Sequence, residues 1–264
     1  MSKPTSDTPN GSGPEMLFGD RFKGVRAVVI GGRGAIGAEV VSQLKSLGAS
    51  VIIGSHSHDG IATAAADLEG DGQATLQVDL RDAPSIQTFA QQVSTLMPSV
   101  DVLILTAGRS VQVPLKQIER LTDEIIDDVF ASAATGVLKT ARAFAPLMRQ
   151  GQDPVMVFVG SVAALTGGGS NIAYASAKGA LETMAIGLAK ALAPDIRVLT
   201  ISPSALETPF VADRDESFIE ATVKATPIGR LTGIDEVALA ILSAARLLTA
   251  STGISIPVDG GRHL

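Results

Sequence analysis

The chain has 264 residues, a mass of 27.0 kDa and a formal net charge of -6, and 45% of its residues are hydrophobic. This size suits one large domain with a substantial core, and the negative charge argues against a nucleic-acid-binding surface. Without cysteine there are no disulfides or thiolate metal sites.

The first predicted segment is a disordered tail over residues 1–16, which is rich in Ser, Thr, Pro and Gly and lacks the apolar stretch of a secretory signal. A single domain is expected over 17–264. No later window reaches the uninterrupted apolar length of about 18 to 20 residues that a membrane helix needs. We therefore expect a soluble, cytoplasmic protein that binds neither membrane nor nucleic acid.

Short β-branched runs alternate with longer helical patterns along the rest of the chain. Several runs are apolar at successive positions, as expected of parallel strands that are covered on both faces. This alternation predicts an α/β fold with a doubly wound parallel sheet of the Rossmann type. Ligands bind such sheets beyond the carboxyl ends of the strands. The predicted strands are 25–31, 49–54, 74–79, 101–107, 154–160, 196–202 and 253–259, and the predicted helices are 35–47, 83–97, 122–149, 173–193 and 234–248.

The first predicted strand is followed by the glycine-rich sequence GGRGAIG. Gly32, Gly34 and Gly37 fit the pattern G-x-G-x-x-G. Gly31, Gly34 and Gly37 also fit the pattern G-x-x-G-x-x-G. Glycine permits a tight turn and lets backbone N–H groups approach a pyrophosphate at the start of the next helix. Between a strand and an amphipathic helix, this sequence predicts a dinucleotide site.

The end of the second strand bears on the choice of dinucleotide. A carboxylate there would bind the adenosine ribose of NAD, but Ser55 and His56 occupy the position and Arg33 lies in the glycine turn. Hydroxyl, imidazole and guanidinium groups suit a phosphate, so the sequence favours NADP, with NAD as the alternative. His56 and His58 could also be solvated turn residues, and no metal site is expected because no further ligand cluster is visible.

The sequence YASAK contains the only tyrosine of the chain. A lone tyrosine is by default an ordinary half-buried core residue. Helical spacing, however, places Tyr174 and Lys178 on one face, one turn apart. Ser161 stands upstream, at the end of a predicted strand.

Together these motifs closely resemble the short-chain dehydrogenase/reductase family, in particular its 3-oxoacyl-(acyl-carrier-protein) reductase-like members. The resemblance spans about 22–262 and also rests on TAG at 106–108, SPSALETP at 202–209 and VDGG at 258–261. It implies an enzyme that moves hydride between NADP(H) and a small secondary alcohol or ketone. An NAD-dependent alcohol dehydrogenase remains an alternative, as does a cofactor-binding scaffold or sensor with weak catalysis.

The resemblance implies a role for each matching residue. Tyr174 would exchange a proton with the substrate oxygen, and Ser161 would hydrogen-bond that oxygen. Lys178 would bond the nicotinamide ribose and lower the pKa of the phenol from its unperturbed ~10, because a nearby ammonium favours phenolate. Pro203, Leu206 and Thr208 would approach the nicotinamide, Asp79 the adenine, and Ala107 with Gly108 the adenosine side. The full set of expected cofactor contacts is Gly31, Arg33, Gly34, Ile36, Gly37, Ser55, His56, Asp79, Leu80, Ala107, Gly108, Tyr174, Lys178, Pro203, Leu206 and Thr208.

Four positions depart from the usual pattern of the family. Ala35 replaces the middle glycine of the turn, and Ser204 replaces the glycine after Pro203. Thr106 replaces an asparagine, so that a hydroxyl rather than an amide would support the strand. Ala133 stands where the family commonly carries an asparagine that helps to hold a proton-relay water. Ser132 or a rearranged water could compensate, or turnover could be slow.

Two further expectations concern the substrate and the assembly. The segment 205–230 should form a substrate lid, in which Phe210, Phe218 and Ile219 could line an apolar pocket. Small residues along helix 173–193 allow close packing, and the resemblance implies that this helix packs against a partner subunit. We expect a homotetramer, or at least a homodimer, with the VDGG end near an interface. The small residues are Ala175, Ala177, Ala180, Gly187 and Ala191.

Overall fold

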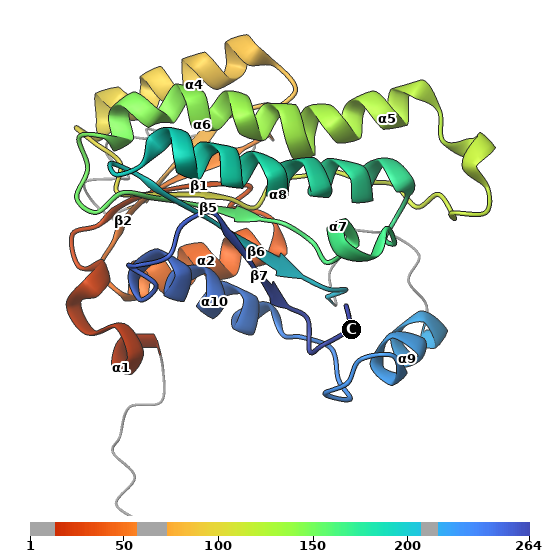
Figure 1. Ribbon diagram of the computed structural model, residues 1–264. Coiled ribbons are helices and arrows are strands. Elements are labelled where there is room, and N and C mark those ends of the chain that lie inside the picture. The colour runs from red at the N-terminus through yellow and green to blue at the C-terminus, as the bar shows by residue number, and fades with distance from the viewer. Residues whose placement is uncertain (1–13, 57–72, 207–215) are drawn as a thin grey trace, which may run out of the picture.

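The computed structural model describes residues 14–56, 73–206 and 216–264. Its seven parallel strands form one sheet in the order β3-β2-β1-β4-β5-β6-β7, with helices on both faces (Figure 1). The predicted doubly wound parallel sheet is therefore confirmed, and each predicted strand lies within two residues of its observed bounds. The strands are β1 (Arg26–Ile30), β2 (Ser50–Ser55), β3 (Gln73–Gln77), β4 (Val102–Leu105), β5 (Val155–Val159), β6 (Arg197–Pro203) and β7 (Ile254–Val258).

Four of the five predicted helices lie within two residues of their observed bounds, whereas the helices Ala163–Thr166 and Glu216–Lys224 were not predicted. Two expectations are corrected. Residues 14–16 of the predicted tail lie in helix α1, while 1–13 fall outside the described residues. The single helix expected over 122–149 is interrupted by the π-helical turn η3 (Ala131–Thr135). Within the described ranges, no helix combines the length and hydropathy needed to cross a membrane. The α-helices are α1 (Pro14–Phe18), α2 (Ala35–Ser46), α4 (Ala83–Leu96), α5 (Asp123–Phe130), α6 (Gly136–Met148), α7 (Ala163–Thr166), α8 (Ile172–Leu192), α9 (Glu216–Lys224) and α10 (Ile234–Arg246), and the 3-10 helices are η1 (Gly19–Phe22) and η2 (Ile118–Arg120).

The sheet is apolar at successive positions because both of its faces are buried. All residues of β4 and β5 are buried. On one face α4, α6 and α8 cover a core that contains Phe89, Phe144 and Phe158. On the other face α1, α2 and α10 cover a core that contains Phe18 and Phe22. Burial on both faces explains why strand periodicity is absent from the sequence.

The strand order changes direction at β1, which pairs with β2 on one side and with β4 on the other. From β1 the chain passes to α2 on one face of the sheet, whereas from β4 it passes to α5 and α6 on the opposite face (Figure 1). The two connections diverge beyond the carboxyl ends of these strands. In open α/β sheets the resulting crevice is where ligands bind.

Candidate active site

A pocket of about 590 Å³ opens at this carboxyl edge of the sheet. It is lined by every predicted site residue that the structure describes, whereas Thr208 lies outside the described residues. Of the predicted lid, Ala205 and Leu206 line the pocket and α9 is helical, while 207–215 are not described. Ile219 is not among the lining residues. The structure therefore gathers the predicted residues but gives Ile219 no place in the pocket wall.

The glycine turn closes tightly against the neighbouring strand. Gly31 has φ +85°, and a Cβ there would lie 2.6 Å from Oγ1 of Thr106 and 2.7 Å from the backbone nitrogen of Ala107. A Cβ at Gly37 would overlap the carbonyl oxygen of Gly31. The Thr106 hydroxyl donates to the carbonyl of Ile30 at 3.1 Å, which confirms the expected support of the strand by a hydroxyl.

The first turn of α2 presents its amides at the pocket. Its N-cap is Gly34, which supplies no side-chain cap, and Ala35 and Ile36 at its start line the pocket. The first turn also lacks acidic residues. Backbone N–H groups at an uncapped helix start bind phosphate oxygens well, and the helix dipole adds to the attraction. These residues fit the pyrophosphate of a dinucleotide.

Helix α8, which carries Tyr174, is anchored by a buried asparagine that the sequence analysis missed. The side-chain oxygen of Asn171 accepts a hydrogen bond from the backbone nitrogen of Tyr174 at 2.7 Å. Its amide nitrogen donates to Oγ of Ser110 at 3.1 Å and to the carbonyl of Val111 at 2.8 Å. One side chain therefore caps α8 and joins it to the loop that follows β4.

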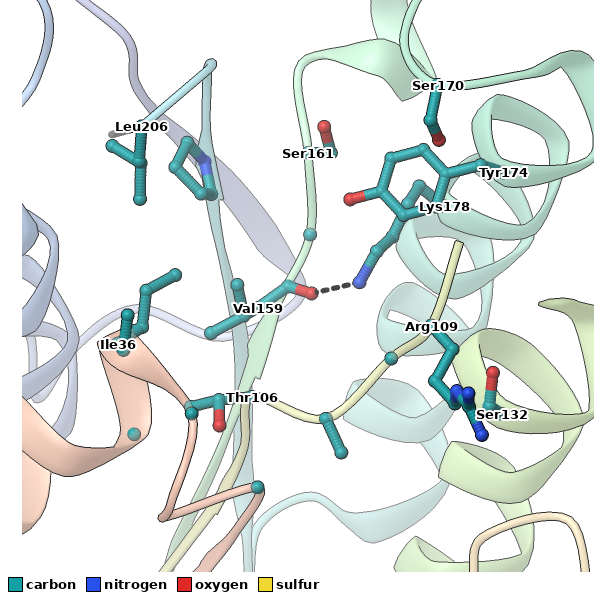
Figure 2. Close-up of a pocket in the computed structure, with 18 of the residues that line it drawn as sticks. Ile36, Thr106, Arg109, Ser132, Val159, Ser161, Ser170, Tyr174, Lys178 and Leu206 are labelled. Atoms are coloured by element: carbon teal, nitrogen blue, oxygen red, sulfur yellow. Dashed lines mark hydrogen bonds between the residues drawn. The ribbon is translucent and has the colours of Figure 1, made fainter. Parts of the chain in front are cut away.

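Lys178 lies one turn beyond Tyr174 on the pocket side of α8. Its Nζ donates to the carbonyl of Val159 at 2.7 Å and lies 5.7 Å from the centroid of the Tyr174 ring (Figure 2). The side chain is only 3% exposed. Burial lowers the pKa of Lys178 to about 8, although the negative charge of Glu182 acts in the opposite direction. The ammonium is thus held next to the phenol ring at a cost in desolvation.

Ser161 stands opposite Tyr174, two residues after the end of β5. Its Oγ accepts a hydrogen bond from the backbone nitrogen of Ala163 at 3.2 Å, which leaves the hydroxyl hydrogen to be donated elsewhere. Figure 2 shows the hydroxyls of Ser161 and Tyr174 facing the same space, with Lys178 beneath them and Leu206 on the far wall. A carbonyl oxygen placed there could accept hydrogen bonds from both hydroxyls.

The position that departs most from the family pattern lies in the π-helical turn. Ala133 is fully buried, and a Cβ at Gly108 would lie 3.9 Å both from the Ala133 methyl and from Nζ of Lys178. The Ser132 hydroxyl donates to the carbonyl of Asp128 at 2.9 Å and so turns back into its own helix. Direct compensation by Ser132 for the missing asparagine is therefore not supported.

At the opposite end of the pocket Arg81 joins the groups that the sequence analysis assigned to adenosine. Its guanidinium donates to both carboxylate oxygens of Asp79 and, at 2.9 Å, to Asp128. Nε2 of His56 lies 2.9 Å from the same guanidinium and 3.3 Å from Asp79. Arg81, followed by His56, lowers the pKa of Asp79 to about 2. The sequence offered no signal for Arg81 beyond its place two residues after Asp79.

Comparison with known proteins decides the family. The family model described as short chain dehydrogenase matches residues 26–217, which is most of the chain. The chain belongs to the short-chain dehydrogenase/reductase family. The resemblance inferred from its motifs is thereby confirmed, and the protein is an oxidoreductase of a family that uses NAD(P) cofactors.

Curated relatives cover nearly the whole chain. The chain is 28% identical to 3-oxoacyl-[acyl-carrier-protein] reductase FabG of Escherichia coli (strain K12), over 92% of this chain and 99% of that protein. It is 31% identical to L-xylulose reductase of Bos taurus, over 91% and 97% of the two chains. A solved short-chain dehydrogenase/reductase of Brucella melitensis, named as a glucose/ribitol dehydrogenase, superposes with a TM-score of 0.83 at 25% identity. The match covers 92% of this chain and 98% of that chain. One of these three proteins is named for an acyl-carrier-protein substrate and two are named for sugars or sugar alcohols.

Proposed function

We propose that the protein transfers hydride between NADP(H) and a secondary alcohol or ketone, with Tyr174 as the acid/base. One observation carries the proposal: the hydroxyls of Tyr174 and Ser161 and the ammonium of Lys178 line the same pocket as the glycine turn. The test is to measure turnover of a panel of carbonyl compounds with NADPH and with NADH, using the absorbance of the reduced cofactor. Cofactor binding without turnover of any carbonyl would favour a scaffold or sensor, the alternative that Ala133 keeps open.

Each polar group has a distinct part in this chemistry. A bound nicotinamide supplies the hydride in reduction and accepts it in oxidation. During reduction Tyr174 gives its proton to the carbonyl oxygen, while Ser161 donates a hydrogen bond to that oxygen. The ammonium of Lys178 stabilises the phenolate that remains. In the oxidative direction the phenolate takes the proton from the alcohol.

NADPH is expected to bind more tightly than NADH. Arg33 and His56 line the pocket at the adenosine end with Ser55, and the charge of the nearby Asp79 is balanced by Arg81. Arg33→Ala should narrow the difference between the two cofactors by about 1 to 3 kcal/mol, the size of a charge-assisted contact. Fluorescence titration of both reduced cofactors measures this. Equal or tighter NADH binding by the wild-type protein would instead support an NAD-dependent dehydrogenase.

We also propose a homotetramer, or at least a homodimer, in which α8 lies at an interface. Ala175 and Ala177 are buried within the chain itself, so of the small residues expected there only Gly187 and Ala191 are exposed. A groove nonetheless runs between α6 and α8, and it is lined mainly by apolar side chains and aliphatic stems. The lining residues are Leu138, Lys139, Ala141, Arg142, Ala145, Pro146, Arg149, Leu188 and Leu192.

Light scattering at micromolar concentration should therefore give a multiple of the 27.0 kDa chain mass. Leu138, 43% exposed on α6, is the natural site for disruption. Leu138→Glu should lower the measured mass by placing a charge in the apolar groove. A monomer mass for the wild-type protein would contradict the proposal.

A further inference from the structure

The last residues of the chain form a tightly bonded turn after β7. The buried carboxylate of Asp259 accepts hydrogen bonds from the backbone nitrogens of Gly261 and His263, both at 2.9 Å. Nδ1 of His263 lies 2.8 Å from the same carboxylate. Gly260 and Gly261 have φ values of +65° and +85°, which side chains rarely adopt. The turn therefore fixes the position from which Arg262 projects.

Arg262 lines the same pocket as Tyr174 and Ser161. Its side chain is half-buried, and its guanidinium donates to the carbonyl of Thr222 in α9 at 3.0 Å. In Figure 1 the C-terminus accordingly lies beside α9, at the carboxyl edge of the sheet. Among the described residues no carboxylate forms an ion pair with Arg262, and the nearby buried Asp259 is bonded to His263. Toward the part of the chain that the structure describes, the guanidinium thus keeps donors for a ligand, whereas the other half-buried arginines there, such as Arg197, are paired with acids.

The charges around the pocket make this arginine informative. Asp79 is the one carboxylate among the described lining residues, and it is bound by Arg81 at the adenosine end. Arg33, Arg109, Lys178 and Arg262 line the pocket as well. This excess of positive charge occurs in a chain with a net charge of -6. A positively charged pocket in a negatively charged protein attracts negatively charged ligands.

We infer that Arg262 binds an anionic group, carboxylate or phosphate, on the carbonyl substrate. Guanidinium matches both anions with two parallel hydrogen bonds, and it binds them more strongly where water is partly excluded. The substrate would then meet the pocket at two places, its reacting oxygen at Tyr174 and Ser161 and its anionic group at Arg262. This inference rests on the proposed function and narrows its substrate class to oxo acids and phosphorylated ketones.

The test compares each anionic carbonyl compound with a neutral partner that has the same carbonyl. A series of oxo acids is paired with the methyl esters, and dihydroxyacetone phosphate is paired with dihydroxyacetone. The wild-type protein should favour the anionic member, and Arg262→Ala should reduce kcat/KM for that member by about 10- to 100-fold, mainly through KM. Activity on the neutral partner should stay within about twofold. Arg262→Lys should restore part of the preference because it retains the charge.

Two controls separate the possible sources of the effect. Arg21→Ala removes an exposed arginine of η1, outside the pocket, and should leave the preference unchanged. NADPH affinity should be the same in Arg262→Ala as in the wild-type protein. A weaker affinity would assign Arg262 to a cofactor phosphate and overturn the inference.

The remaining outcomes distinguish this inference from the proposed function. Turnover of neutral ketones with no preference for their anionic partners would overturn the inference and leave the function intact. Absence of turnover for every carbonyl compound would reject the function. Calorimetric titration of the same pairs into the NADP+ complex reads the preference without turnover. If no compound is turned over, equal affinities for the anionic and neutral members of each pair would still overturn the inference.

Discussion

Replacing Tyr174 with phenylalanine is expected to reduce turnover by about 100-fold to 10,000-fold, the range that general acid–base catalysis contributes. Phenylalanine keeps the ring that packs against the apolar cluster containing alanines of η3 and α8, but removes the hydroxyl that faces Ser161. NADPH affinity should change by no more than a few-fold, because the glycine turn and the start of α2 are untouched. Steady-state kinetics with the best carbonyl compound and a separate cofactor titration measure the two effects.

The composition of the chain gives this variant a spectroscopic control. Tyr174 is the only tyrosine and tryptophan is absent, so Tyr174→Phe should remove all phenolate absorbance from an alkaline titration. Ser161→Ala serves as the matched variant, since it should lower turnover while the phenolate signal persists. A Tyr174→Phe protein that retains more than about a tenth of wild-type turnover would refute the assigned role. The scaffold or sensor would then be the better interpretation.

The sequence predicts the sheet and most of the site because both are encoded in short stretches. Each strand is a compact β-branched run, and the residues that follow the strands reach the pocket through the general geometry of a parallel sheet. Gly31 and Gly37 can be found from spacing alone, since their lack of a Cβ is a local requirement. Tyr174 and Lys178 share one helix, so a single turn of helix brings them together.

Features that depend on contacts between distant parts of the chain escape this reasoning. Asn171 binds Ser110, which is 61 residues away, and Arg81 binds Asp128, which is 47 residues away. Neither pair has a local pattern. Arg262 follows a glycine pair that suggests only a turn, and its place in the pocket wall is decided by the way β7 and α9 approach each other.

The interruption of the predicted helix over 122–149 illustrates a different limit. Its sequence is helical throughout, and no proline or glycine marks the break within Ala131–Thr135. The π-helical turn coincides with tight packing at Gly136, where a Cβ would overlap the carbonyl oxygen of Leu80. Single-turn π-helices often occur at functional sites, and this one carries Ser132 to the pocket wall.

Lys178→Met is expected to stabilise the protein while it impairs catalysis. Burial lowers the pKa of Lys178 to about 8 from its ordinary value of 10.5, so the folded state carries a buried charge that the unfolded chain holds in water. A shift of this size corresponds to a penalty of about 3 kcal/mol. Loss of the hydrogen bond to Val159 offsets about 1 kcal/mol of that. At pH 7 the variant should therefore unfold with a free energy about 2 kcal/mol larger than the wild-type protein.

The dependence on pH gives this prediction its sharpest test. Below about pH 8 both states of the wild-type protein bind the Lys178 proton, and the full penalty is present. Between pH 8 and 10.5 the unfolded state binds more protons than the folded state, so the stability of the wild-type protein rises with pH. The advantage of Lys178→Met should shrink across that window, vanish at about pH 9.5 and become a deficit of up to about 1 kcal/mol near the upper end, where only the lost bond to Val159 counts. Urea unfolding of both proteins at pH 7, 8.5 and 10 measures the change.

Lys190→Met is the matched control, because Lys190 is exposed on the same helix. It should change the free energy of unfolding by less than about 0.5 kcal/mol at every pH. Turnover of Lys178→Met should fall even though its fold is more stable, since the phenolate of Tyr174 loses the cation beside it. A Lys178→Met protein that is less stable than wild type at pH 7, or whose difference does not change with pH, would show that the buried ammonium carries no net penalty. Lys178 would then be a structural residue held by its bond to Val159.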